Sequence, residues 1–221
     1  MYLLEALVLP AAAALAAVVP AQPSPRTAQI CYPGESTKYM CFRQPQGTPQ
    51  DIRVANVKYA AQRLRDYAVA KEELLDTGGN PVLDDDGLSK EVTTYRFLNM
   101  STSTAPNCGE WTIFDQAETV MVTAKLMSPQ QSALVWYGDI ADSIDGGAAG
   151  SGAPEAIMSC GTDGGSREVK VDASQVAYEK HKPDLAAGKY VTSGVVIKIV
   201  QNIEWKKANP DWRMQNSPLG D

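Results

Sequence analysis

The stretch NVKYAAQRLRDYAVAKEELL, residues 56–75, decides the fold. Its apolar side chains recur at the spacing of one helix face, and charged and amide side chains fall on the opposite side. That apolar face consists of Val57, Ala60, Ala61, Leu64 and Ala68. The sequence DTGG at 76–79 then supplies a helix stop. We therefore expect an amphipathic helix over 56–75 that packs against a sheet, with Leu64 buried in the core.

Downstream of this helix the apolar pattern changes to a period of two, which is typical of β-strands. Alternating segments and short apolar runs predict strands at 93–97, 111–114, 120–126, 133–137, 169–171 and 195–200. Residues 173–182 suit a short helix that Pro183 ends, and no internal repeat is evident. One main helix and about six strands predict an α+β fold, with an antiparallel sheet covered on one face; a β-sandwich is the alternative if the helix is shorter.

The N-terminal segment predicts the organisation of the chain. Residues 1–19 are apolar, interrupted only by Glu5 and Pro10. Residues 1–21 are interpreted as a secretory signal peptide. Residues 22–30 are expected to form a flexible arm, 31–205 a single globular domain and 206–221 a polar C-terminal tail. No second apolar run is long enough for a bilayer, so we expect no membrane span after signal cleavage.

The charge balance narrows the classes of partner. The chain has 20 Lys and Arg residues against 26 Asp and Glu residues, a net charge of −6. Binding to nucleic acid or to anionic membranes needs a basic surface, so this balance argues against both. An extracellular or host protein or a glycan remains as the expected partner.

Four cysteines, an even number in a chain expected to be exported, predict two disulfides. Three pairings are possible. We favour Cys31–Cys41, because a short segment with a Pro-Gly turn is entropically cheap to close, together with Cys108–Cys160. There is no CxxC motif and only one histidine, so no zinc site is expected. No phosphate-binding loop or dinucleotide fingerprint is present, so no cofactor is expected.

An acidic series offers one possible cation site. Asp139, Asp142 and Asp145 recur at every third residue, and carboxylates on a helical turn can bind a hard cation such as calcium. The spacing differs from that of the calcium-binding loop. A short amphipathic turn with Ile140 and Ile144 on its apolar side explains the series equally well.

Other carboxylates offer a possible hydrolase site. Glu110, Asp115 and Glu118 lie in or beside predicted strands, and glycoside hydrolysis needs two acids about 5–10 Å apart. The acidic loop tip 84–86 is interpreted as a polar turn. His181 lies among charged residues and is expected to be a solvated surface residue, and no Gly-x-Ser-x-Gly motif is present. No catalytic residue is therefore assigned.

Asn99 begins an Asn-Met-Ser sequence, which is an N-glycosylation acceptor in an exported eukaryotic protein. It lies where a predicted strand runs into a loop rich in serine and threonine. We therefore expect Asn99 to be accessible.

Four stretches support a resemblance: VANVKYAAQRLR at 54–65, NCGEWTIF at 107–114, DIADSIDGG at 139–147 and CGTDGGS at 160–166. With the signal peptide and early cysteines, they resemble small secreted proteins of filamentous fungi, some of which are effectors acting on a host. The resemblance implies no catalytic residues. We expect a secreted, non-enzymatic protein that binds a host or extracellular target; the alternative is a small secreted hydrolase that acts on polysaccharide. A cell-wall structural protein would need a stalk and an anchor signal, which are not evident.

Overall fold

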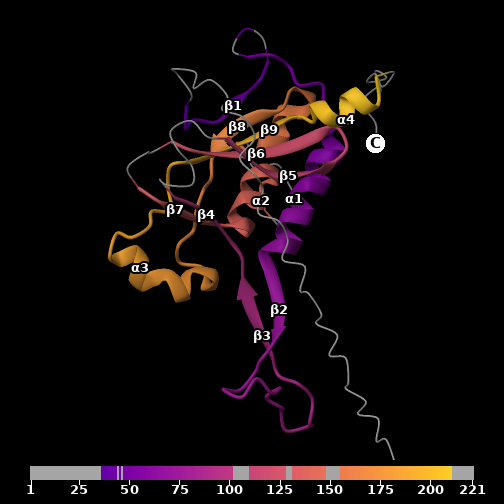
Figure 1. Ribbon diagram of the computed structural model, residues 1–221. Helices are drawn as coiled ribbons and strands as arrows, with labels where there is room; N and C mark the ends of the chain where they lie inside the picture. The colour runs from indigo at the N-terminus through magenta and orange to yellow at the C-terminus, as the bar shows by residue number, and fades with distance from the viewer. Residues whose placement is uncertain are drawn as a thin grey trace, which may run out of the picture.

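The computed structural model describes residues 36–43, 45, 47–101, 110–127, 131–147 and 155–210. The predicted signal peptide and N-terminal arm lie outside the described residues, as do Cys31 and Cys108. The α+β prediction is confirmed (Figure 1). The main sheet is antiparallel, in the order β1-β8-β9-β6-β5, and has five strands where about six were predicted: β1 (Met40–Cys41), β5 (Glu110–Ala117), β6 (Val120–Leu126), β8 (Gly165–Glu168) and β9 (Val195–Gln201).

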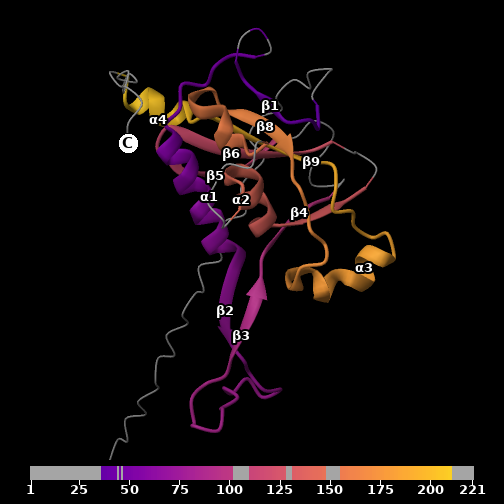
Figure 2. The ribbon, with the colours of Figure 1, turned by 180° about the vertical axis from the view of Figure 1, so that it is seen from behind.

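Helix α1 (Val54–Ala68) buries the apolar face predicted for it, including Leu64, which is 2% exposed. It lies against α2 (Tyr137–Asp145), and both helices cover the same face of the sheet (Figures 1 and 2). The sheet contributes alternate residues to this core: Val120, Val122, Ala124 and Leu126 of β6, and Val195, Ile197 and Ile199 of β9. The helices occupy the face on which a β-sandwich would place its second sheet, so that alternative is wrong.

The predicted helix ends seven residues early, at Ala68 instead of residue 75. Residues Val69–Glu73 form β2, which pairs antiparallel with β3 (Glu91–Tyr95). The next two positions on the helical apolar face would be Lys71 and Glu72, so the next turn of helix would bury no apolar side chain. The chain instead leaves the body as a hairpin that projects from the end of α1 (Figures 1 and 2).

The predicted strand at 169–171 lies instead at β8, immediately before it in the chain. Glycine is required where β8 begins, because a Cβ at Gly165 would lie 2.6 Å from the carbonyl oxygen of Met40 and 2.8 Å from Cys160 Sγ. After β8, the backbone N–H of Lys170 donates to the hydroxyl of Ser143 on α2, 3.0 Å away. This bond turns the chain out of the sheet.

The remaining elements lie around the main sheet. They are β4 (Phe97–Met100), which pairs with β7 (Ala133–Trp136), and η1 (Ile157–Asp163), η2 (Val176–His181), α3 (Lys182–Ala186) and α4 (Ile203–Ala208). Pro183 does not end a helix but lies in the first turn of α3, where its missing N–H leaves no hydrogen bond unmade. Helix α4 runs across the boundary expected between 205 and 206.

The disulfide in the described residues joins Cys41 to Cys160, with Cα atoms 5.2 Å apart. Both predicted pairings are therefore wrong, because each of them uses one of these two cysteines. Strand β1 pairs with β8, and η1 leads directly into β8, so the sheet brings Cys160 beside Cys41. The prediction of Cys31–Cys41 relied on the low entropic cost of closing a short loop. That cost depends only on separation along the chain, so it could not indicate a pairing between segments that the sheet brings together. The bridge is consistent with an oxidising compartment.

Candidate binding sites

A pocket of about 550 Å³ lies on the face of the sheet opposite α1 and α2. Its volume falls within the range of about 300–1,000 Å³ that small-molecule sites occupy. The floor comes from outward-facing strand residues, because Thr112, Thr123 and Lys198 occupy one row across β5, β6 and β9. The walls come from the segment between β1 and α1, from the end of β9 and from α4. Their lining residues are Phe42, Thr48, Gln50, Gln201, Asn202, Ile203, Glu204 and Lys207.

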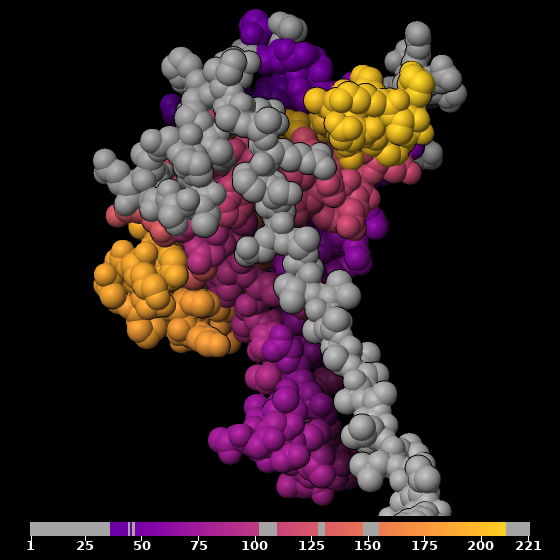
Figure 3. Space-filling view, viewed as in Figure 1, coloured from indigo at the N-terminus to yellow at the C-terminus, as the bar shows by residue number. Residues whose placement is uncertain are grey.

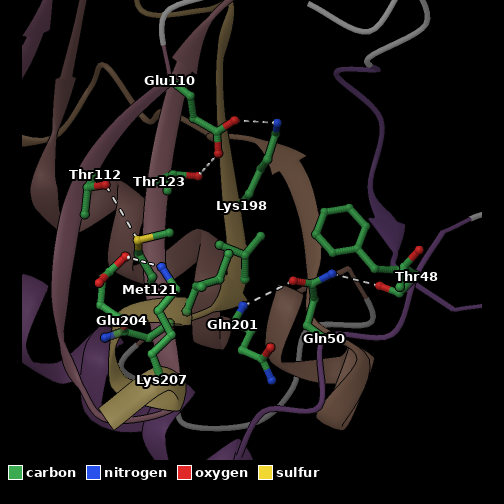
Figure 4. A pocket seen from close by; sticks show the side chains of 14 residues that line it. Thr48, Gln50, Glu110, Thr112, Met121, Thr123, Lys198, Gln201, Glu204 and Lys207 are labelled. Atoms are coloured by element: carbon green, nitrogen blue, oxygen red, sulfur yellow. Dashed lines mark hydrogen bonds and ion pairs between the residues drawn. The ribbon is translucent and has the colours of Figure 1, made fainter. Parts of the chain in front are cut away.

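Two glutamate–lysine ion pairs mark opposite ends of this pocket (Figure 4). At one end the hydroxyl of Thr123 donates to Glu110, and Lys198 Nζ lies 2.8 Å from the Glu110 carboxylate. This pair is largely buried, with 12% of the Glu110 side chain exposed. At the other end Lys207 Nζ lies 3.2 Å from the exposed carboxylate of Glu204. The four charges that line the pocket therefore cancel.

Two of the three carboxylates proposed for a hydrolase, Glu110 and Asp115, lie far apart along β5. Glu110 begins β5, Asp115 lies five residues further along it, and Glu118 lies in the turn before β6. At about 3.3 Å per residue, the first two lie roughly 16 Å apart, well beyond the 5–10 Å that glycosidases require. Glu118 instead accepts hydrogen bonds from Arg53 and Asn56 at the start of α1. The glycosidase spacing is therefore absent between Glu110 and Asp115.

The acidic series lies on α2, where the neighbouring isoleucines pack in the core and two of the aspartates bind α1. Ile140 and Ile144 are fully buried, as the amphipathic interpretation predicts. Asp142 and Asp145 both bind the guanidinium of Arg65 on α1, with the shortest N–O distances 2.8 Å to each. The hydrogen bond to Asp145, followed by that to Asp142, raises the pKa of Arg65. In the described part of the chain, no group of three or more His, Cys, Asp or Glu residues is arranged to hold a metal ion.

Asp139, the first acid of the series, points in another direction and is buried. The hydroxyl of Tyr178 donates to its carboxylate at 2.6 Å, and the backbone N–H of Trp136 donates to that hydroxyl at 2.9 Å. Burial raises the pKa of Asp139 to about 6, helped by the charges of Asp142 and Asp172, although the Tyr178 hydrogen bond acts in the opposite direction. This network ties η2 to the start of α2.

We expect Asp139→Asn to change how stability depends on pH. The folded state raises the pKa of Asp139 from 3.8 to about 6, so it binds this proton more tightly than the unfolded chain does. Stability from this group is therefore complete below pH 4 and is lost as the pH rises to about 6, by up to about 3 kcal/mol.

Denaturant titrations between pH 4 and pH 7 measure this effect. The unfolding free energy of the wild type minus that of Asp139→Asn should fall over that interval, while the same difference for Asp85→Asn, on an exposed loop, should stay flat. A flat difference for Asp139→Asn would show that its carboxyl titrates alike in both states.

His181 is less solvated than predicted. Its ring packs edge-on against Phe97 with centroids 4.6 Å apart, and the residue is half-buried. The polar residues next to His181 in the sequence do not indicate this contact. It arises because β4, which holds Phe97, and η2, which holds His181, lie against each other in the fold. Asn99 on β4 is exposed, so the structure leaves the predicted glycosylation acceptor accessible.

The hairpin β2–β3 and the loop at its end, residues 69–95, form a projecting arm. It stands apart from the body of the molecule in the space-filling view (Figure 3). The arm holds two lysines and seven acidic residues, a net charge of −5 out of −6 for the whole chain. It also exposes large apolar side chains: Val69, Leu74, Leu75, Leu83, Leu88 and Val92.

Two equivalent turns build the tip of the arm. The carboxylate of Asp76 accepts hydrogen bonds from the N–H groups of Gly78 and Asn80, and that of Asp84 accepts from those of Asp86 and Leu88. The third residue after each aspartate is a glycine with φ of 79°. The N–H groups of Asn80 and Gly78 lower the pKa of Asp76. The tip is thus a defined structure that presents carboxylates and leucines together.

No family model, curated protein or solved structure matches the chain. The resemblance to small secreted fungal proteins therefore remains an expectation from the sequence. None of the helices in the described ranges combines the length and apolar character needed to cross a membrane.

Sequence reasoning missed the arm, although a signal was present. The motif Leu-Asp-x-x-Gly occurs at 75–79 and again at 83–87, eight residues apart, and each copy forms one of the two turns. The expectation of no internal repeat was wrong on this short scale. The acidic tip at 84–86 is a turn, as predicted, and one half of a repeated pair.

Proposed function

We propose that this is a secreted, non-enzymatic binding protein of the fungal effector type, whose arm binds a basic surface on an extracellular or host protein. The arm supports this proposal, because it joins a net charge of −5 to exposed leucines on a ribbon that projects from the body. Exposed apolar side chains that cluster within a polar surrounding mark interaction sites.

The physical properties of the arm favour a partner over a purely structural role. An isolated two-stranded ribbon is marginally stable in water and gains stability when another surface covers it. A second copy of the arm would bring the same negative charge against it, which disfavours self-association. A surface that carries lysine or arginine around an apolar groove satisfies both the charges and the leucines.

Catalysis has less support. Hydrolysis by carboxylates needs an acid and a second group placed to act with it. Glu110, the buried carboxylate of the pocket, binds Lys198 and Thr123, while Asp115 and Glu118 lie elsewhere on β5 and its turn. Incubation with polysaccharides should release no reducing ends.

Peptide selection tests the arm. We expect peptides selected from a displayed random library against the purified protein to be rich in Lys, Arg and apolar residues. The variant Asp85→Lys/Asp86→Lys leaves the turn-forming Asp84 in place and should bind these peptides at least about tenfold more weakly, because it replaces attraction by repulsion. Binding should also weaken as salt rises.

The matched control is Glu179→Lys/Asp184→Lys, which makes the same change in net charge at exposed positions on η2 and α3. It should bind the selected peptides like the wild type. Leu83→Ser/Leu88→Ser should weaken binding without changing charge. Selected peptides without cationic excess, or an equal loss in the control, would contradict a role for the arm.

A further inference from the structure

We propose that the pocket on the outer face of the sheet binds a neutral oligosaccharide. This site is separate from the arm, since the pocket is lined by residues of the body and the arm begins at Val69. A test of sugar binding by the pocket therefore does not depend on the proposed function of the arm.

The polar groups of the pocket match a ligand that is rich in hydroxyls. Glu110 supplies a charged acceptor, Lys198 a charged donor, and Thr112 and Thr123 supply hydroxyls, all on the sheet floor. A sugar hydroxyl both donates and accepts, so adjacent hydroxyls can contact the carboxylate and the ammonium together. A ligand with donors only, or acceptors only, would satisfy one half of this set.

The charge of the pocket favours a neutral ligand. Each lining glutamate is paired with a lining lysine, at 2.8 Å for Glu110–Lys198 and 3.2 Å for Glu204–Lys207. An anionic ligand would compete with a glutamate for its lysine, and a cationic ligand would compete with a lysine for its glutamate. In either case one residue of the ion pair would lose its partner. Such a loss is costly for the buried pair.

The apolar part of the lining suits the C–H face of a sugar ring. Phe42, Met121, Val200 and Ile203 line the pocket together with the polar groups. The face of an aromatic ring is electron-rich and attracts polarised C–H groups. The two ion pairs lie at opposite ends of the pocket with Met121 between them (Figure 4), which suits an elongated ligand with polar groups along its length.

Titration calorimetry with defined sugars tests the proposal. We expect at least one of chitotetraose, cellotetraose and mannotetraose to bind the folded protein, and tetragalacturonate to bind more weakly than that sugar. The variant Glu110→Gln/Lys198→Met removes both charges at once, so no unpaired charge stays buried. It should bind the neutral sugar about tenfold more weakly or worse, because hydrogen bonds to charged groups are lost.

The control Glu179→Gln/Lys182→Met removes an exposed pair with the same chemistry outside the pocket and should leave affinity unchanged. Ile203 lies on the rim of the pocket and is 56% exposed, so Ile203→Asp should fold normally and also weaken sugar binding. This variant tests the proposal if the double variant is unstable. Failure of all three neutral sugars to bind, preference for tetragalacturonate, or full affinity in Ile203→Asp would overturn the proposal.

Discussion

Replacing Leu64 by alanine should lower the free energy of unfolding by about 2–5 kcal/mol, as for other leucines removed from a packed core. Leu64 is 2% exposed and lies on the face of α1 that meets the sheet and α2. The loss combines the transfer of its methyl groups to water with the cavity left behind. Denaturant unfolding, followed by far-UV circular dichroism, measures the shift in midpoint.

The arm offers a matched control for this substitution. Leu88 is 67% exposed at the tip, so Leu88→Ala makes the same chemical change where nothing packs closely. Its unfolding free energy should stay within about 0.5 kcal/mol of the wild type. Equal midpoints for Leu64→Ala and Leu88→Ala would mean that α1 contributes little to the core.

Removal of the Cys41–Cys160 bridge should have an effect of similar size. The bridge closes a loop with a sequence separation of 119, and constraining so long a loop in the unfolded chain stabilises the fold by about 4–5 kcal/mol. The double variant Cys41→Ala/Cys160→Ala should lose that amount. Thermal unfolding under oxidising conditions measures it.

Reduction is the control for the bridge. A reductant should lower the stability of the wild type markedly and that of the double variant much less. Peptide mapping without reduction should recover the segment around Cys41 linked to that around Cys160. Recovery of Cys41 linked to Cys31, or a double variant as stable as the wild type, would contradict the assignment.

The sequence by itself determined which residues of α1 face the core. The five apolar positions read from residues 56–68 are the five that the structure buries. The same holds for β6 and β9, whose alternating residues divide between the core and the outer face. Periodicity carries this information because it depends only on local geometry and on the need to bury one side of each element.

The tertiary structure decided what these elements meet. The end of α1 at Ala68 depends on where the core stops, and the pairing of Cys41 with Cys160 depends on β1 lying beside β8. Glu110 and Lys198 are 88 residues apart in sequence and meet because β6 lies between β5 and β9. Contacts of this kind follow from the order of strands in the sheet, which no local pattern in the chain records.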